Sequence, residues 1–337
     1  DTFVEIDAFV QHRSGDHNLH LHRPLGDGVV AGHGMLDGRR IVCFAQDYSI
    51  FEGTMGEMHA KKISKIVEFA EKSMLPVIGI WDGDGQRAHE GVSSLGATGE
   101  LLDVFAACSG RIPILSLILG TVSGVSALAA GLSDFVILGS EHGQMFMRSP
   151  YFIPEVINGE IDEETLGGAE SHSSRSGIAC LVADDEHDAI NIAAEILGYL
   201  PDHTLAESLI VNSSDKWDRS CKKLEQIVPS DSNKPYDMSQ VVKEVVDEGR
   251  FLELFPSYAE NILIGFARLD GQSIGIVANQ PKVLAGCLDI DSSVKAARFI
   301  RTCDIFNIPV VTFVDVPGFL PGTVQEWGGI IRHGAKM

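Results

Sequence analysis

Apolar residues in the first part of the chain change their spacing twice, and each change predicts a different element. From Val29, the stretch VVAGHGMLDGRRIVCFAQD holds two apolar runs on either side of Asp-Gly, a pair typical of a tight hairpin turn. The next apolar residues recur at helical spacing: Ile63, Ile66, Val67, Ala70 and Met74. PVIGIWD follows and is apolar almost throughout, as in a parallel strand that is buried on both faces. The pattern therefore predicts a hairpin, a helix and a buried strand that ends in the glycine-rich segment GDGQRAHEG.

The same order of elements returns 233 residues further along the chain, without a gap. The stretch ILIGFARLDGQSIGIVANQ begins at Ile262, and the apolar run PVVTFVD leads into PGFLPG. At this offset Gly32 meets Gly265, and Asp82 meets Asp315. Such a repeat predicts two copies of one β-β-α unit, and therefore an α/β fold with a mostly parallel inner sheet. We expect Asp82 and Asp315 to stand at equivalent places, at the end of the third strand of each copy.

The two copies set the expected domain boundaries. The first copy continues through IPILSLILG and TVSG into the alanine-rich helix VSALAAG, and a polar, proline-containing linker is expected at 212–237. We predict an N-terminal domain at residues 1–225 and the first part of a second domain at residues 226–337. The second copy continues for only nineteen residues after Gly318. We therefore expect the second domain to be incomplete, with the counterpart of TVSGVS beyond Met337.

Composition and charge narrow the function classes. The 337 residues are 45% apolar and 22% charged, which is typical of a globular protein. The net charge of −21 argues against a surface for nucleic acid or anionic membranes, because such a surface is basic. The sequence has no apolar run long enough for insertion into a membrane. Its six cysteines are scattered without CxxC spacing, which indicates reduced thiols in an intracellular protein.

Two segments carry backbone groups that suit a negatively charged oxygen. GDGQRAHEG leaves a buried strand as an open loop, and GTVSG begins the alanine-rich helix, whose first N–H groups lack acceptors within the helix. Two such N–H groups that meet at one oxygen form an oxyanion hole. The same loops could instead do no more than close the sheet, and the residues alone leave both interpretations open.

Other kinds of site have weaker support. GDGQRAHEG lacks the Gly-Lys-Ser/Thr of a nucleotide-phosphate loop and the spacing of a dinucleotide fingerprint. The histidines of QHRSGDHNLHLHR have no acidic or cysteine partners at metal-site spacing, so we predict that they bind no structural metal. Ser123 and Ser126 stand beside a helix start, but the sequence assigns them no Ser-His-Asp arrangement. His89 and Glu90 could form an acid–base pair or simply the polar rim of the loop.

Five stretches together resemble one known family. They are GDGVVAGHGMLDGR, FAQDYSIFEGTMGEMHAKKI, EETLGGAESHSSRSGIA, IGIVANQP and TFVDVPGFLPGTVQEWGGIIRHGAK. In these stretches the chain resembles the carboxyltransferase (β) subunits of biotin-dependent acyl-CoA carboxylases, with the propionyl-CoA carboxylase type the nearest. The similarity covers essentially the whole chain, and the last stretch is the most specific.

This resemblance implies two crotonase-like (ClpP/crotonase) β-β-α spiral domains, the first for acyl-CoA and the second for biotin. It implies a ligase or transferase reaction that moves a carboxyl group from carboxybiotin to the α carbon of propionyl-CoA or a related acyl-CoA. Biotin would be carried on a partner protein, the biotin carboxylase/biotin carrier α subunit, and coenzyme A would be part of the substrate. The resemblance implies no metal. It implies a hexamer, a trimer of dimers, located in the cytoplasm or, in a eukaryote, in the mitochondrial matrix.

Carried over residue by residue, the resemblance assigns catalytic backbone N–H groups to Gln86, Gly124 and Val125. It assigns substrate contacts to Gly85, Arg87, Ser123, Ser126, Gly318 and Phe319. The chain departs from the family pattern in the acyl-CoA half. It has Asp-Gly-Gln-Arg at 84–87 where Gly-Gly-Ala-Arg is usual, and Ser-Gly-Val-Ser at 123–126 where Ala-Gly-Gly-Ala is usual. A valine at 125 restricts the backbone and crowds the space that a glycine would leave.

These departures keep two alternatives open beside an active carboxyltransferase. One is a non-catalytic β-like subunit that keeps the ring interface but has lost the acyl-CoA hole. The other is the α subunit of a biotin-dependent acyl-CoA decarboxylase, which has the same fold and runs the same chemistry backwards.

Overall fold

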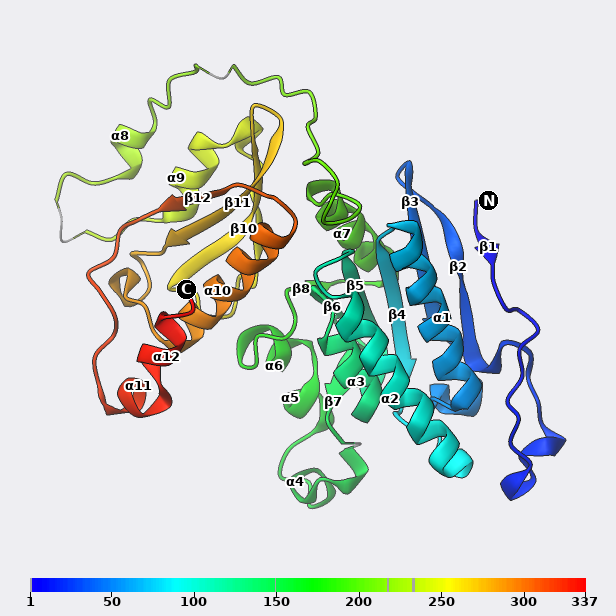
Figure 1. Cartoon of the computed structure of the whole chain (residues 1–337). Coiled ribbons are helices and arrows are strands. Elements are labelled where there is room, and N and C mark those ends of the chain that lie inside the picture. Colours follow the sequence, from blue (N-terminus) through cyan, green and yellow to red (C-terminus); the bar gives the residue numbers. More distant parts are fainter. Residues whose placement is uncertain (1, 149, 217, 232–233) are drawn as a thin grey trace. The chain divides into compact units, whose positions relative to one another are not determined.

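The computed structural model describes residues 2–148, 150–216, 218–231 and 234–337 (Figure 1). The chain divides into two compact units, Asp1–Glu195 and Ile196–Met337, and each has its own sheet. The sequence predicts a boundary at 225/226 between a domain for acyl-CoA and a domain for biotin. This division by ligand stays a prediction. Within the predicted linker at 212–237, positions 217 and 232–233 lie outside the described residues.

The first unit is built on an eight-stranded sheet, counted over the described residues. The strand order is β1-β2-β3-β4-β5-β6-β8, and β7 pairs with β5. The strands β1, β2 and β3 pair antiparallel, whereas all pairs from β3 onward are parallel. The bounds are β1 Val4–Glu5, β2 Val29–Leu36, β3 Arg39–Gln46, β4 Val77–Gly83, β5 Ile114–Ser123, β6 Phe135–Gly139, β7 Gln144–Phe146 and β8 Leu181–Ala183.

Helices α1 and α2 pack against each other over one face of this sheet (Figure 1). Between helices and sheet lies Trp81 of β4, whose ring centroid is 5.0 Å from that of Phe44 and whose indole N–H donates to Ser116 Oγ at 2.8 Å. The helices of the first unit are α1 Glu57–Ser73, α2 Gly91–Cys108, α3 Gly124–Gly131, α4 Pro154–Ile157, α5 Glu163–Gly167 and α6 Ala169–Ser174, and α7 Glu186–Tyr199 follows β8.

The second unit repeats the beginning of the first. Its sheet has the order β12-β11-β10-β9, with β9, β10 and β11 antiparallel and β12 parallel to β11. The strands are β9 Leu252–Leu254, β10 Ile262–Leu269, β11 Gln272–Asn279 and β12 Val310–Phe313. The helices are α8 Leu224–Ile227, α9 Met238–Val245, α10 Ile290–Ile305, α11 Thr323–Gly328 and α12 Ile330–Gly334.

Strand register confirms the repeat read from the sequence. Val42 pairs with Val77 between β3 and β4, and at the same offset Gly275 pairs with Val310 between β11 and β12. A hydrogen bond to a side-chain amide also occurs at the same place in both copies. The N–H of Asp82 donates to Gln46 Oε1 at 3.1 Å, and the N–H of Asp315 donates to Asn279 Oδ1 at 3.3 Å. The two aspartates therefore occupy equivalent places at the carboxyl ends of β4 and β12.

A buried lysine also occurs at the same place in both copies. Lys62 Nζ donates to the carbonyl oxygen of Val29 at 2.6 Å, and Lys295 Nζ donates to that of Ile262 at 2.9 Å. The ammonium of Lys295 also binds the carbonyl oxygens of Phe255 at 2.9 Å and Tyr258 at 2.7 Å. Each lysine thus ties the first strand of its hairpin to the helix that covers it.

Lys295→Met should lower the free energy of unfolding by about 2–3 kcal/mol at pH 7, because several buried carbonyl oxygens lose their donor. Burial lowers the pKa of Lys295 from 10.5 to about 8. Between these two pH values the unfolded chain holds more protons than the folded chain, so the wild type gains stability relative to the variant as the pH rises. Urea unfolding of both proteins at pH 7 and pH 10 measures the difference.

Lys72→Met is the matched control, because Lys72 is 70% exposed and pairs with Glu68 on the surface of α1. It should change the free energy of unfolding by less than about 0.5 kcal/mol. Equal stabilities of Lys295→Met and Lys72→Met would show that the buried ammonium does not hold the carbonyl group cluster.

Candidate active site

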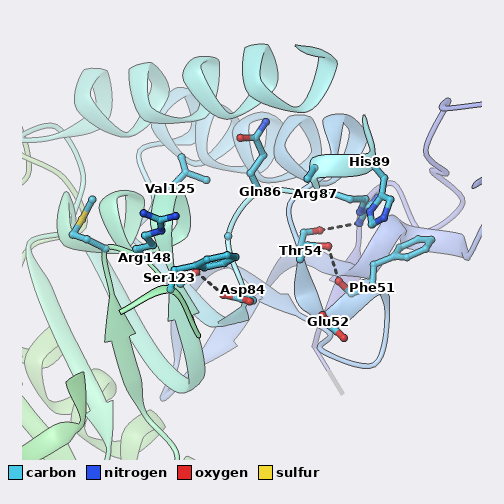
Figure 2. Close-up of a pocket in the computed structure, with 15 residues that line it drawn as sticks. Phe51, Glu52, Thr54, Asp84, Gln86, Arg87, His89, Ser123, Val125 and Arg148 are labelled. Atoms are coloured by element: carbon cyan, nitrogen blue, oxygen red, sulfur yellow. Dashed lines mark hydrogen bonds between the residues drawn. The ribbon is translucent and has the colours of Figure 1, made fainter. Parts of the chain in front are cut away.

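The loop after β4 and the start of α3 border a cavity of about 660 Å³ in the first unit (Figure 2). Its walls come from Phe51, Glu52 and Thr54, from residues 84–89 and 123–125, and from Met147, Arg148 and Phe152. β4 and β5 are parallel neighbours, with Gly83 beside Val122, and this pairing brings the segments that follow them to the same edge of the sheet. Ligands of α/β sheets bind at this edge.

The two loops touch through glycines. Gly85 has φ +72°, and a Cβ at this position would lie 3.2 Å from Ser123 Oγ and 3.3 Å from the Ser123 carbonyl oxygen. Gly124 has φ +57°, and its Cβ position lies 3.9 Å from the Cα of Gly85. Glycine suits both positions because it adopts positive φ without strain and leaves room for the opposite loop.

A hydrogen bond across the loops replaces the usual helix cap. Ser123 is the N-cap residue of α3, but its hydroxyl accepts no hydrogen bond from the N–H groups of the first turn and instead donates to Asp84 Oδ1 at 2.6 Å. Figure 2 shows this bond as a dashed line. The uncapped first turn keeps its N–H groups available, and such groups favour negative charge.

Backbone hydrogen bonds hold the loop after β4 on both sides of Gln86 but do not use the N–H of Gln86 itself. Met55 N–H donates to the carbonyl oxygen of Gly85 at 2.7 Å, and Arg87 N–H donates to that of Met55 at 2.9 Å. Within the described part of the chain, neither the N–H of Gln86 nor that of Val125 has a hydrogen-bond acceptor. Both residues line the cavity, as do Gly85, Arg87, Ser123 and Gly124.

Val125 lies in the wall of this cavity. Its side chain is partly buried and packs against the hydrophobic core of the first unit. The side chain thus contacts both the core and the cavity, and the crowding expected of a valine at this position stays a prediction.

A buried ionic cluster of Arg87, Asp27 and Glu90 holds the loop after β4 from the interior of the first unit. Arg87 is 2% exposed, and its Nη1 donates to Asp27 Oδ1 at 2.7 Å and to Glu90 Oε1 at 2.8 Å. Its Nη2 donates to the carbonyl oxygen of Thr54 at 2.9 Å, and the guanidinium carbon lies 4.4 Å from the centre of the Phe51 ring. Arg87 thus lines the cavity while its guanidinium is engaged inside the protein. Its predicted contact with substrate stays a prediction.

The cluster continues through a neutral histidine. Burial, and then the charge of Arg87, lower the pKa of His59 to about 3. His59 Nδ1 lies 3.0 Å from the carbonyl oxygen of Asp27, and its Nε2 lies 3.0 Å from Gln46 Nε2. Gln46 Oε1 accepts from the N–H of Asp82, so its Nε2 donates to His59 and the imidazole proton stands on Nδ1. The chain of contacts therefore links Asp27 to the end of β4.

The remaining predicted site residues lie elsewhere. Ser126 is fully buried in α3 and does not border the cavity, and its hydroxyl has no hydrogen-bond partner in the described part of the chain. Gly318 and Phe319 belong to the second unit, in the loop after β12. There Leu288 N–H donates to the carbonyl oxygen of Gly318 at 3.0 Å, which repeats the bond from Met55 to Gly85.

The described residues offer neither a metal site nor a membrane-spanning helix. They contain no group of three or more His, Cys, Asp or Glu side chains arranged to hold a metal ion. Among them there is also no helix that combines the length and the apolar character needed to cross a membrane.

Sequence reasoning missed Asp27, Gln46 and His59. A usable signal was present in α1, where His59 and Lys62 fall on the same helical stripe as the buried Ile63 and Ile66. Polar residues on a buried stripe need internal partners, which points to a buried network. The partners themselves are distant in sequence, and only the fold identifies them.

Comparison with known proteins gives consistent matches. A family model described as carboxyl transferase domain matches residues 1–337. The methylmalonyl-CoA decarboxylase subunit alpha of Veillonella parvula is 47% identical over 337 residues, covering 100% of this chain and 66% of that protein. The propionyl-CoA carboxylase beta chain of Saccharopolyspora erythraea is 45% identical over 344 residues, covering 100% of this chain and 63% of that protein. The chain thus spans slightly less than two thirds of the length of these relatives.

A solved structure agrees with them. The crystal structure of transcarboxylase 12S, described as a hexamer assembly with methylmalonyl-coenzyme A bound, matches with a TM-score of 0.95 and 40% identity. The match covers 99% of this chain and 65% of that chain.

Proposed function

The chain belongs to the carboxyl transferase family, and from this premise we propose that it transfers a carboxyl group from carboxybiotin to the α carbon of propionyl-CoA or a related acyl-CoA. The observation that carries the proposal is the cavity where two touching loops each offer a backbone N–H without an acceptor, at Gln86 and Val125. We infer that these two groups converge on the thioester oxygen.

The residues around the cavity act on the acyl-CoA through their backbone. As the α carbon loses its proton, negative charge moves to the thioester oxygen, where the N–H groups of Gln86 and Val125 stabilise it. The partial positive charge at the start of α3 adds to this effect. Arg87, held by Asp27 and Glu90, keeps the loop in place so that the donors need not reorganise.

The second unit offers a site of the same kind for biotin. The loop after β12 repeats the bond pattern of the first loop, and a Cβ at Gly318 would meet open space, which leaves room for a ureido group. Carboxybiotin, when bound, supplies carbon dioxide and a ureido nitrogen that takes the α proton. Gly318 and Phe319 would hold the ureido oxygen of that group.

We propose the assembly and the location of this protein by analogy with its relatives. The transcarboxylase 12S structure is described as a hexamer, and we propose a hexamer, a trimer of dimers, for this protein as well. Biotin would arrive on a separate biotin carboxylase/biotin carrier subunit. We place the protein in the cytoplasm, or in the mitochondrial matrix if the source is eukaryotic.

The reverse direction is the second candidate function. A relative with 47% identity is named a methylmalonyl-CoA decarboxylase subunit, and the same cavity can stabilise the enolate in either direction. A non-catalytic subunit is less well supported, since Val125 packs against the core and the cavity stays open.

The purified protein with its biotinylated partner should incorporate ¹⁴C from bicarbonate into propionyl-CoA when the partner's carboxylase and ATP are supplied. Val125→Gly should change this rate less than about threefold, because the wild-type cavity is already open. If the protein instead releases ¹⁴CO₂ from carboxyl-labelled methylmalonyl-CoA and incorporates none, the decarboxylase assignment replaces the main one. A large gain of carboxylation in Val125→Gly would show that valine blocks the wild-type site.

A further inference from the structure

Two residues that depart from the family pattern contact each other. Asp84 stands two positions before Gln86, and Ser123 stands two positions before Val125. Their side chains are joined by the hydrogen bond from Ser123 Oγ to Asp84 Oδ1, 2.6 Å long, and both residues line the cavity (Figure 2). In the family pattern that the chain resembles, glycine and alanine are usual at these two places.

The carboxylate of Asp84 keeps its capacity to accept a proton. In the part of the chain that the structure describes, Ser123 is the one group that donates to it, and it takes part in no ion pair. The nearby guanidinium of Arg87 is already engaged by Asp27 and Glu90. Glu52, the other carboxylate of the cavity, lies at the opposite end from Arg148 in Figure 2. Asp84 is therefore the acidic side chain that belongs to the donor loop itself.

We propose that Asp84 is a general base that exchanges the α protons of a bound acyl-CoA with solvent, without biotin. This activity rests on the proposed function, because it uses the same acyl-CoA cavity and the same oxyanion donors. It differs from carboxyl transfer in its base, which is a side chain of this protein.

The step is balanced within the cavity. The free oxygen of Asp84 forms a bond to the α hydrogen, the C–H electron pair becomes the C=C bond of the enolate, and the thioester oxygen takes the negative charge. Asp84 becomes neutral as the enolate forms, so the charge in the cavity does not increase. The proton on Asp84 exchanges with water, and its return to the α carbon restores the same thioester. A carboxylate can act as the base in this way when an oxyanion hole stabilises the enolate.

Ser123 is a positioning residue in this scheme. Its hydroxyl holds Oδ1 and leaves the other oxygen for the substrate. The hydrogen bond thereby fixes the orientation of the carboxylate in the cavity.

Incubation of the full chain with propionyl-CoA in D₂O, without biotin or partner, should place deuterium at the α carbon, as measured by mass spectrometry of the recovered thioester. Asp84→Asn should lower the exchange rate at saturating propionyl-CoA about 10²-fold or more. The asparagine keeps an oxygen for Ser123, so this variant removes the base and retains the bond between the loops. Asp37→Asn, in the exposed hairpin between β2 and β3, removes the same charge outside the cavity and should exchange at the wild-type rate.

Ser123→Ala should lower the exchange rate at saturating propionyl-CoA, because the carboxylate is no longer held in place, and Ser123→Thr, which keeps the hydroxyl, should restore the rate. Two results overturn the proposal: no exchange by a wild type that binds propionyl-CoA in calorimetry, or equal exchange by the wild type and Asp84→Asn. Failure of the wild type to bind propionyl-CoA contradicts the proposed function first, and this proposal with it.

Discussion

Gly85→Ala should lower the rate of propionyl-CoA carboxylation by about 10²–10³-fold. The added methyl group would lie 3.2 Å from Ser123 Oγ and 3.3 Å from the Ser123 carbonyl oxygen, which is closer than ordinary contact. Either the loop or Ser123 must therefore give way by a few tenths of an ångström. In the proposed site, where the N–H groups of Gln86 and Val125 reach one oxygen, this shift weakens at least one of the two hydrogen bonds. Single-turnover ¹⁴C incorporation with the carboxylated partner measures the chemical step directly.

Gly38→Ala separates this effect from backbone strain. Gly38 has φ +81° in the hairpin between β2 and β3, and a Cβ there would meet nothing within 4 Å. Both variants force alanine into the left-handed region, which costs about 1–2 kcal/mol of stability. Only Gly85→Ala should lose activity. Carboxylation by Gly85→Ala above half the wild-type rate would show that the two loops do not act on one oxygen.

The fold could be predicted because its signals are local and repeated. Apolar runs, Asp-Gly hairpins and a helical stripe recur at one offset, and the strand registers of both units follow that offset. The likeness to transcarboxylase 12S, at a TM-score of 0.95, confirms the predicted α/β fold with crotonase-like domains. The approach of the two donor loops was also predictable in outline, since parallel strands β4 and β5 end at the same edge.

The interior of the site could not be predicted in the same way. Asp27 and Arg87 are 60 positions apart, and Asp84 and Ser123 are 39 positions apart. No periodic pattern relates residues so distant, and a charged side chain in a loop is usually solvent-exposed. The resemblance to the family assigned Arg87 a contact with substrate, and this contact stays a prediction. In the structure its buried carboxylate partners give it a second, structural role.

That role has an energetic basis. Asp27, Arg87 and Glu90 are all nearly inaccessible to solvent, with Asp27 0% exposed and Arg87 2% exposed. Desolvation makes such charges costly one by one, and burial raises the pKa of Asp27 even though Arg87 acts in the opposite direction. The cluster is therefore stable as a set and unstable when one member is removed.

Arg87→Met should lower the free energy of unfolding by about 3–5 kcal/mol, because two buried carboxylates lose their shared cation. Methionine fills part of the space, so the loss is mainly electrostatic rather than a cavity effect. Urea unfolding at pH 7 measures it. Adding Asp27→Asn and Glu90→Gln to Arg87→Met should recover part of the loss, since the carboxylates no longer need neutralisation.

Arg111→Met is the matched control for burial. Arg111 Nη1 lies 2.7 Å from Glu71 Oε1, the same distance as Arg87 Nη1 from Asp27 Oδ1, but its side chain is 63% exposed. Water and salt screen such a pair, so its loss should cost less than about 1 kcal/mol. If the two arginine variants are equally stable, geometry alone sets the value of these pairs and the buried cluster does not hold the loop. A loss confined to Arg87→Met shows that the interior charges fix the loop on which the Gln86 donor stands.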